Sequence, residues 1–153
     1  MEKVFHFDAL REPYQADAAV VACFDHRFRL ALPKYLKRNG ILATDSIIVA
    51  GGAKSLASPA NETDREFALG QLRTSVRLHR TPRVILSVHS DCGAYGGLDG
   101  AFRGDVRAEA QHHEEELRRA SACVAAAIPE IEIQALFIDF EGIWNVNLSA
   151  GCP

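Results

Sequence analysis

Four short apolar runs divide the chain, at residues 18–23, 46–50, 83–89 and 131–138. They are rich in Val and Ile, and their apolar positions are mostly continuous rather than alternating. This pattern is typical of parallel strands that are covered by helices on both faces. The sequence therefore predicts four buried parallel strands.

Segments with helical spacing lie between these runs, at residues 30–38, 64–79 and 105–128. Proline is tolerated near a helix start, which suits Pro33, and Pro129 stops the third segment. Strands that alternate with helices predict an α/β protein with a doubly wound sheet flanked by helices. We expect residues 1–153 to form one domain.

Chemically reactive side chains follow the first and third runs. Cys23 opens the motif Cys-Phe-Asp-His-Arg, while His89 and Cys92 belong to His-Ser-Asp-Cys-Gly. Ligands of such sheets bind beyond the carboxyl ends of the strands, where both motifs lie. Two thiolates and one imidazole suit zinc, and three protein ligands leave a fourth position for water or substrate. The sequence therefore predicts a zinc site formed by Cys23, His89 and Cys92.

Charge and composition narrow the function classes. The formal net charge is −3, from 17 basic and 20 acidic residues, and no basic stripe indicates nucleic acid as a partner. The first residues lack the apolar segment of a signal peptide, and no apolar run approaches the ~20 residues of a membrane span. We expect a cytoplasmic protein without a membrane partner. In that setting its four cysteines favour a metal or catalytic role over disulfides.

Two rival motifs fit less well. The segment from Cys23 to Arg29 matches the Cys-x5-Arg loop of cysteine phosphatases, but its residues are bulky and Asp25 puts negative charge where phosphate would sit. That interpretation also leaves the second motif unexplained. The glycine-rich residues 96–100 lack the Lys-Ser/Thr of a phosphate loop, and we expect them to form a flexible loop near the metal.

The two motifs together resemble those of the β-class carbonic anhydrases. That family carries Cys-x-Asp-x-Arg after its first strand and His-x-x-Cys after its third, as at residues 23–27 and 89–92 here. Residues 137–142 also resemble the last strand of the family and its turn. The resemblance implies a four-stranded parallel core ordered 2-1-3-4 and pairing with a second subunit.

The same resemblance implies an activity, the zinc-dependent reversible hydration of CO2 to bicarbonate by a zinc-bound hydroxide. Cys23, His89 and Cys92 would then be the Zn2+ ligands, with Asp25 and Arg27 as a catalytic pair. In some family members this carboxylate becomes a fourth ligand and closes the site. The sequence leaves open a closed, non-catalytic zinc protein, hydrolysis of carbonyl sulfide or carbon disulfide, and a purely structural Asp25–Arg27 ion pair.

The chain departs from the family in several places. Residues before position 18 are too few for the family's long helical arm, residues 50–55 lack its Arg-Asn pair, Tyr14 replaces a glutamine, and His26 replaces a serine. We expect a homodimer that is built differently, in which residues 131–138 or the loops after Gly93 meet the partner.

The remaining reactive side chains have simpler interpretations. Asp91 is expected to cap its turn. His112 and His113 precede three glutamates, which favours a solvated helix face. Cys123 is expected in the core, and Cys152 as an unpaired thiol in the tail.

Overall fold

The computed structural model of the chain describes residues 1–9 and 11–148. Within these residues one sheet has the strand order β2-β1-β3-β4-β5, in which the first four are parallel and β5 is antiparallel to β4. The α/β fold and the order 2-1-3-4 are thus confirmed, and β5 extends the sheet. The strands are β1 (Ala18–Ala22), β2 (Thr44–Ile48), β3 (Arg83–His89), β4 (Glu132–Ile138) and β5 (Ile143–Asn145).

The three predicted helices are present, and polar side chains cap the amino ends of the two longer ones. The Asn61 side chain accepts a hydrogen bond from the Asp64 amide, and the Asp105 carboxylate accepts from the next helix's first turn. Two short helices and two 3-10 turns are too brief for a periodic pattern to predict. The helices are α1 (Ala31–Arg38), α2 (Lys54–Ala57), α3 (Glu62–His79), α4 (Leu98–Phe102) and α5 (Val106–Ala127), and the turns are η1 (His26–Phe28) and η2 (Gly93–Tyr95).

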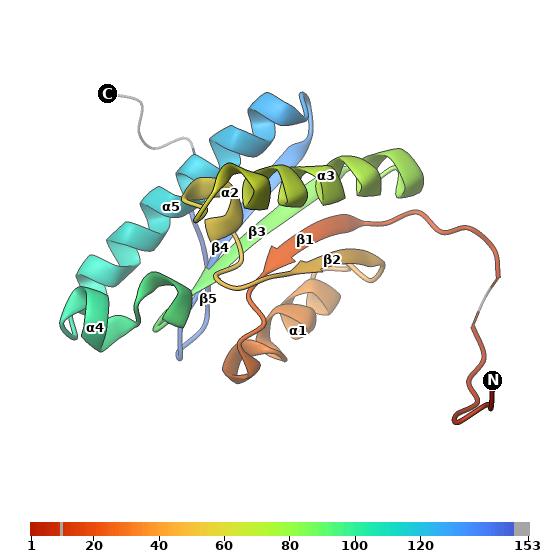
Figure 1. Cartoon of the computed structure of the whole chain (residues 1–153), viewed down its shortest axis with the longest axis horizontal. Coiled ribbons are helices and arrows are strands. Elements are labelled where there is room, and N and C mark those ends of the chain that lie inside the picture. The colour runs from red at the N-terminus through yellow and green to blue at the C-terminus, as the bar shows by residue number, and fades with distance from the viewer. Residues whose placement is uncertain (10, 149–153) are drawn as a thin grey trace.

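The two sheet faces are covered unequally. Helices α2, α3 and α5 lie on one side, and α1 lies on the other (Figure 1). Successive residues of β1 point to opposite faces: Val21 belongs to the larger apolar cluster, and Val20 to the smaller cluster beneath α1. Because β1 and β3 are buried on both faces, their apolar runs are continuous.

Strand β2 is not buried as predicted, because within residues 1–9 and 11–148 it is an edge strand whose one partner is β1. Ile47 packs into the core, whereas Ser46 and Ile48 are exposed. The order 2-1-3-4 also implied that residues 131–138 would form the opposite edge of the sheet. Strand β5 pairs with β4 and covers it, so residues 131–138 are not the edge of this sheet.

The prediction that His112, His113 and the following glutamates lie on a solvated face of α5 is wrong for two of these residues. His113 is 0% exposed and Glu116 is 1% exposed, whereas His112 is only half-buried. His113 and Glu116 share the inward face of α5 with Leu117, and that face packs on β3, β4 and α2. Burial lowers the pKa of His113 to about 3. Glu116 is satisfied by the Ser58 hydroxyl and an ion pair with Arg119.

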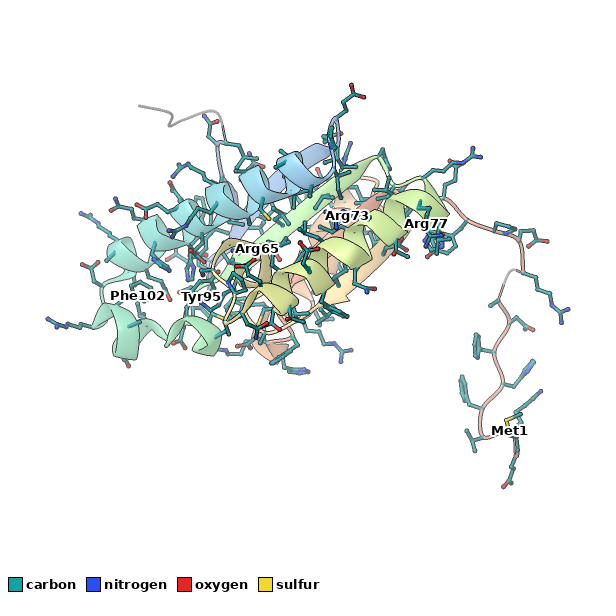
Figure 2. The ribbon with its side chains drawn as sticks, turned by 45° about the horizontal axis from the view of Figure 1, so that its top comes forward. Met1, Arg65, Arg73, Arg77, Tyr95 and Phe102 are labelled. Atoms are coloured by element: carbon teal, nitrogen blue, oxygen red, sulfur yellow. The ribbon has the colours of Figure 1, made fainter. Side chains whose placement is uncertain are left out.

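Outside the sheet and its helices, residues 1–9 are exposed, and Met1 lies far from the body (Figure 2). Cys123 is a half-buried free thiol packed against the larger core cluster, while Cys152 lies outside the described residues. Among the described residues, no helix combines the length and apolarity needed to cross a bilayer.

A close backbone approach follows β2 at Gly52. Its φ is +56°, and a Cβ there would lie 2.3 Å from the Ser87 carbonyl oxygen and 3.0 Å from the Cys23 amide nitrogen. Only glycine allows the turn after β2 to pass so close to β1 and β3. The close contact with Gly52 therefore restricts the position of the Cys23 backbone.

We predict that Gly52→Ala destabilises the protein much more than Gly40→Ala. Gly40 also has a positive φ, +74°, but a Cβ there would meet nothing within 4 Å. Gly40→Ala should therefore cost only the backbone strain, about 1 kcal/mol. Gly52→Ala should cost a further ~2 kcal/mol, because the backbone must shift to relieve the clash. Urea unfolding measures both, and equal losses would contradict the close approach.

Candidate metal centre

Three potential metal ligands converge at the carboxyl ends of β1 and β3. One donor atom from each of Cys23, His89 and Cys92 lies within 4.8 Å of the other two. Cys23 directly follows β1, His89 is the last residue of β3, and Cys92 precedes η2. Zinc–sulfur bonds are about 2.3 Å long, so donors this close can share one ion after a small side-chain adjustment. The structure thus brings together the three residues predicted to bind zinc.

The orientation of the His89 ring suits a metal ligand. Its Nδ1 donates to the Ser90 carbonyl oxygen at 2.8 Å, which leaves the lone pair on Nε2. Nε2 is buried and has no hydrogen-bond partner among the described residues. Phe28 packs on the ring, with 4.7 Å between the ring centroids. An unpartnered buried nitrogen aimed at two sulfur atoms is the arrangement that a cation would complete.

The pKa shifts of the two thiols also favour a metal site. Hydrogen bonding from Cys92 outweighs burial and, with the contribution of His89, lowers the pKa of Cys23 to about 4. The hydrogen bond to Cys23 and burial together raise the pKa of Cys92. For His89, burial opposes protonation, but the adjacent Cys23 sulfur and the Ser90 carbonyl outweigh it and raise the pKa. The lowered pKa of Cys23 favours its thiolate, the form in which cysteine binds a divalent cation.

Asp25 and Arg27 form a tight pair beside the three donors. The Asp25 carboxylate accepts from Arg27 Nη2 at 2.7 Å, from Nε at 3.1 Å and from the Arg27 amide at 2.9 Å. Asp25 Oδ2 lies 3.9 Å from His89 Nε2. The hydrogen bond from the Arg27 side chain lowers the pKa of Asp25 to about 2. Asp25 is therefore an acceptor at neutral pH, next to the position that a metal would take.

Arg27 also ties the first motif to the second. Its Nη1 donates to Asp91 Oδ2 at 2.7 Å, and its Nη2 donates to the Asp91 carbonyl oxygen at 2.8 Å. Asp91 Oδ1 accepts from the Leu98 amide at 2.9 Å, so its carboxylate caps the start of α4 rather than its own turn. Asp91 thus links the start of α4 to Arg27, and neither contact follows from the motif alone. The Arg27 guanidinium also lies 5.6 Å from the centroid of the Phe140 ring.

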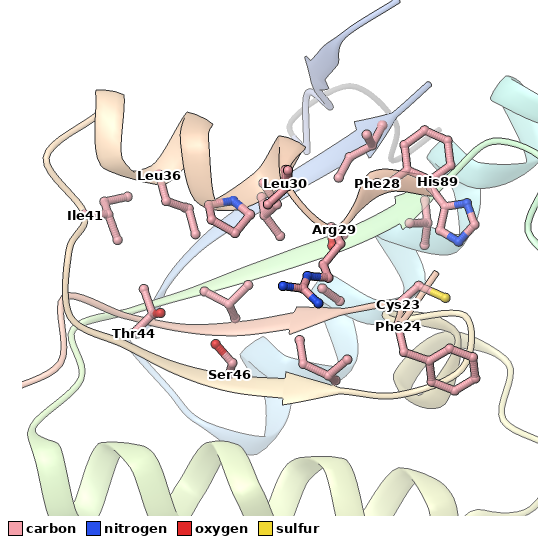
Figure 3. Close-up of a pocket in the computed structure, with 18 of the residues that line it drawn as sticks. Cys23, Phe24, Phe28, Arg29, Leu30, Leu36, Ile41, Thr44, Ser46 and His89 are labelled. Atoms are coloured by element: carbon pink, nitrogen blue, oxygen red, sulfur yellow. The ribbon is translucent and has the colours of Figure 1, made fainter. Parts of the chain in front are cut away.

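An apolar trough of about 530 Å³ runs from the metal centre along the α1 face of the sheet. Cys23, Phe28 and His89 lie at one end, and Leu36 and Ile41 lie at the other (Figure 3). Strand β2 forms one wall with Thr44, Ser46 and Ile48. Of the helices in the described part of the chain, α1 is the one that packs on this face, together with Phe28 of η1.

Some residues singled out in the sequence lie elsewhere. Tyr14 is at the amino end of the strands, where its hydroxyl donates to Asp45 at 2.6 Å and its ring stacks on His79. His26 begins η1 and is exposed. The glycine-rich residues 96–100 do not form a loop throughout, because only Gly96 and Gly97, both at positive φ, precede α4, and residues 98–100 are its first residues.

Comparison with known structures identifies the class of the fold. Carbonic anhydrase from Streptococcus mutans aligns with a TM-score of 0.62 at 19% identity, covering 92% of this chain and 88% of that one. The β-carbonic anhydrase isoform I of Trichomonas vaginalis aligns with a TM-score of 0.60 at 15% identity, covering 92% and 87%. Carbonic anhydrase from Glaciozyma antarctica gives 0.58 at 22%, covering 88% and 84%. The chain therefore has a β-carbonic anhydrase fold.

The family follows from the sequence match. Residues 14–148 match the model of the family described as "Putative carbonic anhydrase", and the chain belongs to that family. No curated protein matches the chain by sequence. The resemblance that the two motifs indicated is thus confirmed, and the family match extends over nearly the whole chain.

We predict that the purified protein holds about one zinc per chain and that Cys92→Ser loses most of it, because a neutral hydroxyl replaces a thiolate. Cys123→Ser is the matched control, since Cys123 is a free thiol packed against the core. Elemental analysis after dialysis measures the metal content. Full zinc occupancy in both Cys23→Ser and Cys92→Ser would refute the site.

Proposed function

We propose that the protein catalyses the zinc-dependent reversible hydration of CO2 to bicarbonate. The observation that carries this proposal is the position of Asp25, a carboxylate held by Arg27 with Oδ2 3.9 Å from the unpartnered Nε2 of His89. Three ligands leave a fourth zinc position free, and a fixed acceptor lies beside it. A purely structural zinc site needs neither feature.

Zinc, when bound, would lower the pKa of a coordinated water to near 7 and so supply a hydroxide nucleophile at neutral pH. Asp25 would accept a hydrogen bond from the nucleophile and thereby direct its lone pair toward the carbon of CO2. Because the pKa of Asp25 is about 2, its carboxylate stays an acceptor throughout the neutral range. Arg27 would keep that carboxylate in place with a forked, charge-assisted contact.

The Arg27 contacts favour an open site over one that Asp25 closes. To bind the metal, Asp25 would have to leave the guanidinium, which is itself anchored on the carboxylate and carbonyl of Asp91. This double anchorage opposes the movement. Asp25 as a fourth ligand, in a non-catalytic zinc protein, is therefore the weaker interpretation.

We further propose a homodimer in which a second copy covers the trough and its rim. The rim carries exposed apolar side chains: Leu30 is 61% exposed, Leu42 is 70% exposed and Ile48 is 51% exposed. The edge of β2 lies in the same region and offers unpaired backbone groups. A self-associating surface would bury both, and the trough opens beside Cys23.

Arg27→Ala should retain zinc and lower CO2 hydration by about 10²-fold, because Asp25 is then free to move or to bind the metal. Asp25→Asn should also keep zinc but lose rate, since its amide can present NH2 to the nucleophile. The control is Arg38→Ala at the exposed end of α1. Stopped-flow CO2 hydration and elemental analysis measure rate and metal together.

Different outcomes would assign different functions. Wild-type rates in both variants would make the Asp25–Arg27 pair structural. Activity that appears only above about pH 8 would favour the site closed by Asp25, because hydroxide competes with the carboxylate for zinc. Sulfide release from carbonyl sulfide without CO2 hydration would instead assign the hydrolase activity.

Light scattering should give a dimer at micromolar concentration, and Ile48→Asp should shift it toward monomer because a charge would enter the apolar contact. Phe67→Asp is the control, since Phe67 is 58% exposed but lies on α3, across the sheet. A monomeric wild type, or equal effects of the two substitutions, would contradict the proposed surface.

A further inference from the structure

A buried glutamate on α5 contacts the loop between the two ligands of the second motif. Glu109 is 1% exposed, and each of its carboxylate oxygens accepts a hydrogen bond from that loop. Oε1 accepts from the Asp91 amide at 2.7 Å, and Oε2 accepts from the Ser90 hydroxyl at 2.5 Å. No sequence motif singled out this residue, because it lies far from residues 89–92 along the chain.

The two residues that Glu109 holds are those that orient the metal centre. The Ser90 carbonyl accepts from His89 Nδ1 and so fixes the ring with Nε2 facing the two cysteines. Asp91 accepts from Arg27 through both its carboxylate and its carbonyl. A displacement of residues 90–91 would therefore move a candidate ligand and release Arg27 from its anchor.

A carboxylate is well suited to this position. Asp91 has a φ of 53°, a left-handed conformation that side chains other than glycine adopt at a cost. Its amide and the Ser90 hydroxyl both point into the protein, where an unmet donor is unfavourable. The two oxygens of Glu109 satisfy both donors, and the Ser90 amide is separately tied to the Ile138 carbonyl at 2.8 Å. The loop is thus held from α5 on one side and from β4 on the other.

We propose that Glu109 is a positioning residue of the metal centre, which holds Ser90 and Asp91 so that His89 and Arg27 keep their orientations. The proposal rests on the zinc site proposed above, but not on the reaction. Groups that orient metal ligands in this way typically contribute 10- to 100-fold to metal affinity.

The test compares Glu109→Ala with Glu116→Ala. Both residues are 1% exposed and lie on α5, but Glu116 hydrogen-bonds Ser58 and pairs with Arg119 instead of residues 90–91. Competition with a chromophoric chelator should give zinc affinity about 10- to 100-fold weaker in Glu109→Ala and within about 3-fold of wild type in Glu116→Ala. The visible spectrum of the cobalt-substituted protein should change in Glu109→Ala alone.

Conservative variants separate positioning from folding. Glu109→Gln should stay near the wild-type affinity, because its amide oxygen can accept from Asp91 while its NH2 donates to the Ser90 oxygen. Ser90→Ala removes one of the two hydrogen bonds and should weaken zinc binding by about 3- to 10-fold. If Glu109→Ala does not fold, the zinc affinity of Ser90→Ala tests the positioning role instead.

Wild-type zinc affinity and cobalt spectrum in Glu109→Ala, or in Ser90→Ala where the first variant does not fold, would overturn the positioning role. Equal losses in Glu109→Ala and Glu116→Ala would overturn it too, by showing a general effect of emptying the α5 face. These results differ from failure of the proposed reaction, in which the wild type binds zinc but does not hydrate CO2. A wild type that binds no zinc would overturn both proposals.

Discussion

The parallel pairing of β1 with β3 is the constraint on which the site depends. Their register, with Val21 opposite Leu86, makes both strands end at the same edge of the sheet, so that Cys23 and His89 emerge side by side. Close packing on both faces fixes this register, because a slip of one residue would place each side chain against the opposite helix layer, where its shape does not fit. Gly52 adds a close backbone contact behind Cys23. The metal centre is therefore built on the most buried part of the molecule.

The second motif is held in place by hydrogen bonds from outside its own strand. Asp91 accepts from Arg27 of the first motif, and the loop around it is tied to α5 and β4. This network connects the candidate ligands with the Asp25–Arg27 pair. A displacement of either motif would therefore displace the other. The apolar trough ends at Cys23 and His89, so a second copy that covers it would enclose the metal centre in apolar surroundings, which suit a small uncharged substrate.

The sequence predicted those features that short local patterns determine. Continuous apolar runs marked β1 and β3, and two motifs of fixed spacing marked Cys23, His89 and Cys92. It failed where tertiary contacts decide. Ile48 has the sequence context of a buried strand, but β2 has a neighbour on one side only. His113 stands before three glutamates, yet the helix turns it inward.

Glu109 illustrates the same limit most clearly, because its role exists only once α5 has packed against the loop after β3. No spacing rule links a glutamate to a motif so far along the chain. By contrast, Asp25 and Arg27 are separated by one residue, so their pairing could be predicted from the first motif alone.

The central claim is that a zinc ion held by these three side chains makes the protein an enzyme for CO2. Stopped-flow CO2 hydration by wild-type protein of measured zinc content, at pH 7 and pH 8.5, tests it most directly when repeated after chelation and zinc replacement. We predict a catalysed rate that is proportional to bound zinc, is lost on chelation and returns with the metal. A fully zinc-loaded protein that hydrates CO2 no faster than the zinc-free protein at either pH would contradict the claim.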